Sequence, residues 1–280
     1  MSECNHDCGN CASKKDGTCG GGFRVPANAK SHVKRVVAVM SGKGGVGKSL
    51  VTELLAVGAR RRGLRVGILD ADITGPSIPT AFGVAEHAHS DGESILPCRS
   101  AGGIDVMSVN LLVENPADPV VWRGPVIAGA VKQFWSDVAW GEKDVLFVDM
   151  PPGTGDVPLT VFQSLPIAGT VLVTSPQDLV AMIVEKAARM AAMMKIPVLG
   201  CVENMSYFKC PDCGRTHRLF GDGRTAAIAQ AHGIAATAAL PVDPALAQAV
   251  DVGRVESYET DALDAVLDAV LAASPAEDAK

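Results

Sequence analysis

The stretch SGKGGVGKSL at residues 41–50 limits the fold of this chain more than any other segment. The pattern G-x-x-x-x-G-K-S/T is matched by Gly42, Gly47, Lys48 and Ser49. An apolar run, RVVAVM, precedes the pattern, and a stretch of helical character, SLVTELLAVGARRRG, follows it. Because glycines between a strand and a helix let backbone N–H groups converge on phosphate oxygens, this arrangement predicts a phosphate-binding loop.

The candidate nucleotide-binding residues of this loop are Gly42, Lys43, Gly44, Gly45, Val46, Gly47, Lys48 and Ser49. We expect Lys48 to neutralise the β- and γ-phosphates of a nucleotide, and the Ser49 hydroxyl to bind Mg²⁺. Lys43 is one lysine more than such a loop needs, and it lies too far along the loop to duplicate Lys48. Its side chain should therefore point elsewhere; the alternative is a solvated lysine of the loop.

Apolar segments alternate with helical stretches along the chain, which is typical of a parallel sheet covered on both faces. The predicted strands lie at 35–40, 64–70, 144–149, 169–175 and 196–204. Apolar residues make up 48% of the chain but aromatic residues only 4%, so small aliphatic side chains must build the core. We expect an α/β, doubly wound, mostly parallel sheet of the P-loop NTPase type over 32–280, preceded by a short Cys-rich metal-binding tail at 1–31.

Three aspartates follow predicted strands. Asp70 and Asp72 belong to LDADITGPSIP, and Asp149 ends the strand of FVDMPPGTGD. The carboxyl ends of parallel strands meet at one sheet edge, so these side chains are expected near the nucleotide, together with Lys48. Asp149 would hold Mg²⁺ through water, and Asp70 or Asp72 would orient the attacking water. A strand-terminal aspartate can also simply cap the next helix.

Cys210 and Cys213 form C-x-x-C in a loop near 205–216, after a predicted strand. Clustered cysteines outside a disulfide framework are first considered as metal ligands. One pair supplies half of a set of four thiolates, and nothing else in the main domain completes the set. His217 offers an alternative, in which zinc is bound by both cysteines, the histidine and one more group. The isolated Cys98 and Cys201 are expected to be small apolar residues or bystanders.

The amino-terminal segment carries enough cysteines for a complete metal site within one chain. The spacing C-x3-C-x2-C-x7-C is formed by Cys4, Cys8, Cys11 and Cys19. Such clustering favours a metal, but it leaves open an iron-sulfur cluster, zinc or a redox-labile set of thiols. His6 could replace one of the thiolates.

Ordered motifs along the chain resemble those of one family of nucleotide-binding proteins. They are GKGGVGKS, DADITGPSIP, WRGP, DMPPGTGD, SPQD, ENMSYFKCPDCG and LFG, within residues 35 to about 255. The first is similar to the deviant Walker A sequence of MinD- and ParA-like ATPases, and the whole set closely resembles the Mrp/ApbC iron-sulfur carriers. This resemblance implies a MinD/ParA-like fold and an ATPase that holds a labile iron-sulfur cluster and transfers it to apo-proteins.

In that family the additional lysine of the loop crosses a homodimer interface, so the resemblance implies that Lys43 is a catalytic cation acting on phosphates bound by the partner chain. It also implies that Asn204 contacts adenine, which makes ATP with Mg²⁺ the expected nucleotide. Cys210 and Cys213 of both chains would bridge one 4Fe-4S cluster at the two-fold axis. The implied partners are a second copy, apo iron-sulfur proteins and the cluster assembly machinery.

Charge and hydropathy argue against several other classes of protein. A formal net charge of −6 gives no general attraction to nucleic acid or anionic membranes, and the basic run 60–62 is expected to be a solvated helix end. No run reaches the roughly 18 apolar residues of a membrane span, and no secretory signal is evident, so we expect a cytoplasmic protein. Two alternatives stay open. One is a MinD/ParA-like positioning switch, against which the acidic stretch from Ser257 counts, and the other is an ATP-driven iron-sulfur electron donor.

Overall fold

The computed structural model describes residues 24–73, 75–113, 124–223 and 225–275. Outside this part lie the first two residues of WRGP and the amino-terminal candidate ligands Cys4, Cys8, Cys11, Cys19 and His6. Residues 24–31, which the sequence analysis assigned to the tail, contact the domain. The Val25 N–H donates to the Ser164 carbonyl at 2.8 Å, and the Trp135 indole N–H donates to the Val25 carbonyl at 2.9 Å.

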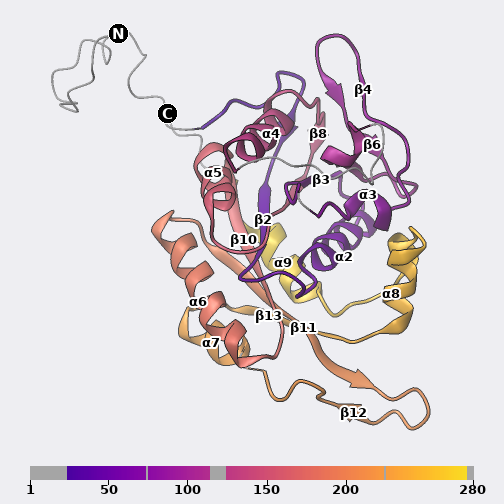
Figure 1. Cartoon of the computed structure of the whole chain (residues 1–280), viewed down its shortest axis with the longest axis vertical. Helices are drawn as coiled ribbons and strands as arrows, with labels where there is room; N and C mark the ends of the chain where they lie inside the picture. The colour runs from indigo at the N-terminus through magenta and orange to yellow at the C-terminus, as the bar shows by residue number, and fades with distance from the viewer. Residues whose placement is uncertain (1–23, 74, 114–123, 224, 276–280) are drawn as a thin grey trace, which may run out of the picture.

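A nine-stranded sheet forms the centre of the domain (Figure 1). Its strands follow the order β12-β11-β10-β2-β9-β3-β7-β6, and β13 also pairs with β11. The bounds are β2 Val36–Ser41, β3 Val66–Asp70, β6 Cys98–Arg99, β7 Asp105–Met107, β9 Val145–Asp149, β10 Ile167–Thr174, β11 Val198–Lys209, β12 Thr216–His217 and β13 Ala236–Pro241. The pairs are parallel except β6 with β7 and β11 with β12. The mostly parallel sheet that the sequence predicted is therefore confirmed.

Short strands and the helices complete the fold. The short strands pair as β1 His32–Val33 with β8 Glu142–Lys143, and as β4 His89–Ser90 with β5 Ile95–Leu96. The helices are α2 Lys48–Arg61, α3 Ile78–Ala81, α4 Gly124–Ser136, α5 Asp156–Ser164, α6 Asp178–Met193, α7 Thr225–Ala231, α8 Pro244–Asp251 and α9 Asp264–Ala272, with 3-10 turns at Val109–Leu111 and Val255–Ser257. Among the described residues, no helix combines the length and the apolar character needed to cross a membrane.

Two hydrophobic clusters lie on the two faces of the sheet, and β2 shows how its sequence creates both. Val36, Ala38 and Met40 pack in the cluster that includes side chains of α4, α5 and α6. The alternate residues Val37 and Val39 pack in the cluster that includes α2 and α9. Since successive side chains of a strand point to opposite faces, an apolar residue at every position requires helices on both sides.

Strand β11 differs from its prediction, because it continues past the apolar run 196–204 to Lys209. Residues up to Glu203 pair with β10, whereas Phe208 and Lys209 pair with β12. Between these parts, Met205 has φ of +57°, and the register with β13 shifts between Glu203 and Tyr207. This bulge lets the strand leave the sheet and form a hairpin that extends from the body of the domain (Figure 1).

Candidate nucleotide site and cysteine hairpin

The phosphate-binding loop connects β2 to α2, as the sequence predicted. Gly45 and Gly47 have φ of +77° and +81°, in the left-handed region that residues with a Cβ rarely adopt. Gly47 directly precedes the first turn of α2, and a Cβ there would overlap the side-chain amide of Asn204. The loop thus leads into the positive end of a 14-residue helix, an arrangement suited to binding phosphate.

Side chains from the first turn of α2 converge on Asp149, the last residue of β9. The Lys48 ammonium donates to Asp149 Oδ2 at 2.7 Å, and the Ser49 hydroxyl donates to the same oxygen at 2.6 Å. The Thr52 hydroxyl, which the sequence analysis did not single out, donates to Oδ1 at 2.7 Å. Lys48 is only 6% exposed, so the opposite charges of Lys48 and Asp149 compensate one another away from water.

The same cluster fits a magnesium ion. A serine hydroxyl and a carboxylate are the oxygen ligands that Mg²⁺ prefers in nucleotide sites. Ser49 and Asp149 come from different elements, α2 and β9, and their oxygens lie 2.6 Å apart. The roles of Ser49 and Asp149 in binding Mg²⁺ stay predictions, which the chemistry and the proximity of these donors permit.

Asp70 and Asp72 occupy different environments, although only one residue separates them. Asp70 is buried and accepts hydrogen bonds from the Ser108 hydroxyl at 2.9 Å and the Asp72 N–H at 3.1 Å. Burial, and next the negative charge of Asp149, raise the pKa of Asp70 to about 8. Asp72 instead places a carboxylate oxygen 3.5 Å from the Lys48 ammonium. Of the two, Asp72 is the one that forms an ion pair with the phosphate-binding lysine.

Glu53 is a third acidic residue near this cluster, and the sequence analysis missed it. Its side chain on α2 is 1% exposed, and its Oε2 has no hydrogen-bond partner among the described residues. Burial, followed by the charges of Asp149 and Asp70, raises the pKa of Glu53 well above its usual range. The burial of this carboxyl therefore favours its protonated form. The signal available in the sequence was a glutamate inside the apolar stretch LVTELLAV.

Lys43 and Asn204 make contacts on either side of the loop. The Lys43 ammonium donates to Gln177 Oε1 at 2.6 Å, a neutral group that leaves the positive charge of the lysine uncompensated in this contact. Asn204 is buried, and its side-chain amide donates to the Val46 carbonyl at 3.0 Å. Asn204 thus holds the phosphate-binding loop in place, while its contact with adenine stays a prediction, as does the role of Lys43 across a dimer interface.

Cys210 and Cys213 lie at the tip of the hairpin formed by β11 and β12, the cysteine hairpin from here on. The Cys210 N–H donates to the Arg215 carbonyl, and the Gly214 N–H donates to the Cys210 carbonyl, both at 2.9 Å. Cys213 is exposed, and Cys210 is partly exposed. The backbone N–H groups of Cys213 and Asp212 lower the pKa of the Cys210 thiol, which favours the metal-binding thiolate.

The zinc alternative for this hairpin finds no support in the described part of the chain. There, no three His, Cys, Asp or Glu side chains are grouped so that they could hold a metal ion. His217 lies in β12 opposite Phe208 and is exposed. Cys98 and Cys201 are buried, and burial raises the pKa of Cys201 to about 12, as fits an apolar core residue. One chain therefore offers two accessible thiols at the hairpin tip.

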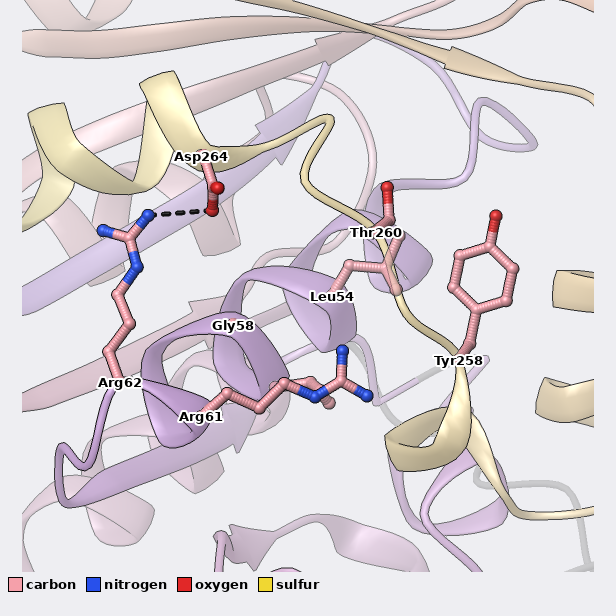
Figure 2. A pocket seen from close by; sticks show the side chains of 8 residues that line it. Leu54, Gly58, Arg61, Arg62, Tyr258, Thr260 and Asp264 are labelled. Atoms are coloured by element: carbon pink, nitrogen blue, oxygen red, sulfur yellow. Dashed lines mark hydrogen bonds and ion pairs between the residues drawn. The ribbon is translucent and has the colours of Figure 1, made fainter.

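The basic run at the end of α2 lines two further cavities. A cavity of about 240 Å³ lies between α2 and the segment before α9 (Figure 2), and it is lined by Leu54, Val57, Gly58, Arg61, Arg62, Tyr258, Thr260 and Asp264. Arg62 forms ion pairs with Asp264 at 2.8 Å and Asp268 at 2.5 Å. Arg60 lines the second cavity, of about 320 Å³, and donates to the Gly102 carbonyl at 2.7 Å. Arg61 and Arg62 are exposed, as expected for a solvated helix end, and the guanidinium groups of the run also bond to neighbouring segments.

The chain is similar to known proteins over most of its length. Residues 32–273 match the family described as ParA: NUBPL iron-transfer P-loop NTPase. An iron-sulfur cluster carrier protein of Clostridium perfringens is 43% identical over 269 residues, covering 90% of this chain and 94% of the relative. A protein with the same name from Methanocaldococcus jannaschii is 42% identical over 262 residues, covering 90% of each chain. These matches span the phosphate-binding loop, and the family match also spans the cysteine hairpin.

Solved structures share the same fold. The nucleotide-binding protein of Archaeoglobus fulgidus, determined in complex with ADP, is 46% identical, with a TM-score of 0.75 over 83% of this chain and 91% of that one. The cell division ATPase MinD of Pyrococcus furiosus is 21% identical, with a TM-score of 0.60 over 85% of this chain and 97% of that one, a likeness of fold alone. The MinD/ParA-like fold implied by the sequence is thus confirmed, and the chain belongs to the NUBPL iron-transfer P-loop NTPases.

Proposed function

We propose that this chain is an ATP-dependent carrier that binds an iron-sulfur cluster as cargo and transfers it to apo-proteins. The observation that carries the proposal is the pair of accessible cysteines at the hairpin tip of a chain with a complete phosphate-binding loop. The relatives named iron-sulfur cluster carrier proteins support this cargo. The relative of Archaeoglobus fulgidus that binds ADP supports an adenine nucleotide.

The number of thiols per chain favours a homodimer. Cys210 and Cys213 supply two ligands, and a 4Fe-4S cluster takes four thiolates. A two-fold axis between two hairpin tips would bring both pairs to one cluster. Exposed thiols on a projecting hairpin also suit release, because an apo-protein can approach the cargo without opening the core. We propose that Cys4, Cys8, Cys11 and Cys19, outside the described residues, form a separate metal site.

Residues at the sheet edge would bind and cleave ATP. The loop from Gly42 to Ser49 would bind the phosphates through its backbone, and Lys48 would exchange its contacts with Asp149 and Asp72 for phosphate oxygens. Ser49 and, through water, Asp149 would hold Mg²⁺, which supplies positive charge beside the phosphates. Asp72 would orient the attacking water, with buried Asp70 behind it.

Lys43 would act in the partner chain. Its ammonium is held by the neutral Gln177 amide, so its charge is available to phosphates across a dimer interface. A cation placed there stabilises negative charge on the transferring phosphoryl group only when two chains meet. Hydrolysis would then depend on assembly of the dimer, and the same assembly would form the bridging cluster site.

Anaerobic reconstitution with iron and sulfide tests the proposal. The intact chain is compared with the variant Cys210→Ala/Cys213→Ala, with a chain starting at Lys30 and with Cys98→Ala, a matched control in which a buried cysteine is removed. We expect the double variant to lose about one four-iron cluster per dimer by metal analysis and absorption spectra, and the control to lose none. The chain starting at Lys30 lacks the amino-terminal cysteines, so the iron that it fails to bind is the iron that those cysteines hold in the intact chain.

Transfer is measured by adding apo-ferredoxin to the loaded protein and following the spectrum of the acceptor. Colourless protein with stoichiometric zinc, or an iron content that is the same in the double variant as in the intact chain, would contradict the carrier proposal. A colourless protein that hydrolyses ATP would favour the alternative function, a MinD/ParA-like positioning switch. Reversible reduction of a bound cluster with no transfer would favour the electron donor instead.

A further inference from the structure

A buried carboxylate that the proposed chemistry does not use closes the base of the cysteine hairpin. Glu203, on β11, is 6% exposed and accepts hydrogen bonds from the Ser206 hydroxyl at 2.6 Å and the Thr225 hydroxyl at 2.5 Å. Ser206 precedes Cys210 and Cys213 in the chain, and Thr225 follows them as the first residue of α7. Glu203 therefore connects the two ends of the segment that carries both cysteines.

The surroundings of Glu203 are shaped for this connection. Ser206 and Thr225 are both buried, so little water competes for their hydroxyl groups. A Cβ at position 223 would overlap the Glu203 carboxylate, so only glycine permits the chain to return this close. Two buried hydroxyl groups on one carboxylate fix the separation of the hairpin ends more firmly than contacts at the exposed tip could.

The residue next to Glu203 contacts the phosphate-binding loop. Asn204 donates its side-chain amide to the Val46 carbonyl at 3.0 Å, and the same amide occupies the space beside Gly47. Adjacent positions of one strand therefore face different partners, with Asn204 on the loop and Glu203 on the hairpin base. A displacement of the loop at Val46 would reach Glu203 through a single peptide bond.

The backbone at this junction is strained and irregular. Met205 has φ of +57°, which is uncommon for a residue with a Cβ and strains the backbone. The pairing of β11 with β13 shifts register across the same residues. Met205 thus lies between Asn204, which contacts the loop, and Ser206, which contacts Glu203, and no flexible linker separates these two residues.

We propose that Glu203 is a positioning residue that couples the cysteine hairpin to the phosphate-binding loop. When nucleotide occupies the loop, the movement passes from Val46 through Asn204 to the adjacent Glu203 and changes the position and accessibility of Cys210 and Cys213. The coupling itself requires only the contacts described above. Its use in loading or releasing a cluster rests on the proposed function.

Thiol labelling of the metal-free, full-length chain tests the coupling without a cluster. Labelling of the peptide that contains Cys210 and Cys213 is followed by mass spectrometry, with and without Mg-ADP. We expect saturating Mg-ADP to change the labelling rate about fivefold or more in the wild type, a typical size for coupling between sites. In Ser206→Ala/Thr225→Val, which removes both hydroxyl donors to Glu203, the two rates should become equal while ADP affinity stays unchanged.

Three further measurements keep the outcome clear. Ser164→Ala removes another buried hydroxyl, one without a hydrogen-bond partner among the described residues, and should keep the wild-type ratio. Glu203→Gln keeps the shape of the side chain and should give an intermediate ratio, while unlabelled Cys201 shows that the core is folded. The coupling would be overturned if Mg-ADP did not change the labelling rate of the wild type. It would also be overturned if Mg-ADP changed the labelling rate of the double variant as much as that of the wild type. A nucleotide effect in a chain that cannot be loaded with iron would instead refute the carrier proposal alone.

Discussion

At the scale of single residues, the candidate nucleotide site places three buried carboxyl groups around one buried ammonium group, that of Lys48. Asp149 pairs with Lys48, while burial, and next the negative charge of Asp149, raise the pKa values of Asp70 and Glu53. Burying four charges together would be costly, so the structure favours the protonated form of Glu53 and raises the pKa of Asp70 to about 8. The phosphates of a nucleotide would then meet fewer negative charges than the sequence suggests.

Asp70 should make the stability of the domain fall as pH rises. Its pKa moves from an ordinary value of 3.8 to about 8, so between these values the folded chain keeps a proton that the unfolded chain releases. Each pH unit in this window then lowers the free energy of unfolding by at most about 1.4 kcal/mol. We expect Asp70→Asn to remove this decline in urea unfolding between pH 5 and pH 8.

Ser108 provides the matched control for this prediction. Its hydroxyl donates to Asp70 and lowers the pKa of that carboxyl against the effect of burial. Ser108→Ala should therefore extend the decline in stability to higher pH rather than remove it. Parallel stability curves for the wild type and Asp70→Asn would mean that Asp70 is ionised in the folded chain.

At the scale of elements, the loop between β2 and α2 is fitted to β11 as well as to a phosphate. Gly47 needs its left-handed backbone to begin α2, and the space where its Cβ would lie belongs to the Asn204 amide. The loop is therefore held by a hydrogen bond and by steric exclusion from the same side chain. Its conformation depends on a strand distant in sequence.

Gly47→Ala should destabilise the domain by more than its backbone conformation alone explains. The left-handed φ costs about 1–2 kcal/mol for alanine, and displacement of Asn204 from Val46 adds the loss of a buried hydrogen bond, about another 1–3 kcal/mol. Gly63→Ala is the matched control, because Gly63 has the same φ of +81° at the end of α2 with open space around a Cβ. If both variants lost the same free energy of unfolding in urea, the Asn204 side chain would move aside without an energetic cost.

At the scale of the whole molecule, the proposed homodimer predicts two half-sites in each chain. The cysteine hairpin offers two thiols, and the loop carries in Lys43 a lysine whose contact is with a neutral amide. Both would be completed by a second copy. Because the strands are parallel, the candidate nucleotide-binding residues that follow β2, β3 and β9 gather at one edge of the sheet. Strand β11 instead continues beyond the sheet and carries the cysteines away from the body of the domain.

Lys43→Ala should separate nucleotide binding from hydrolysis. We expect ADP affinity to stay within about threefold of the wild type and ATP turnover to fall by about 10³-fold, the size of effect known for a cation supplied in trans. Turnover per wild-type chain should rise with protein concentration as dimers form. Gln177→Ala is the control, since it removes the partner of Lys43 but keeps the charge. Unchanged turnover in Lys43→Ala would exclude the trans-acting lysine.

The sequence by itself determined the layered fold and the phosphate-binding loop. Apolar residues at every position of β2 require covering on both faces, and Gly42, Gly47, Lys48 and Ser49 encode their chemistry within a few positions. Such signals are local, so a single chain reveals them without its folded contacts. The same holds for the C-x-x-C pair, whose two thiols are visible from spacing alone.

Only the tertiary structure decided which polar side chains share an environment. Three of these features depend on residues far apart in sequence. They are the raised pKa of Glu53, the contact of Asn204 with Val46, and the hydrogen bond from Thr225 to Glu203 that closes the cysteine hairpin. The apolar stretch around Glu53 indicates its burial, but neighbouring residues encode neither its proximity to Asp149 and Asp70 nor the partners of Glu203. Sequence patterns therefore identified the chemistry of the sites, whereas packing decided the protonation of the acids and the connection between loop and hairpin.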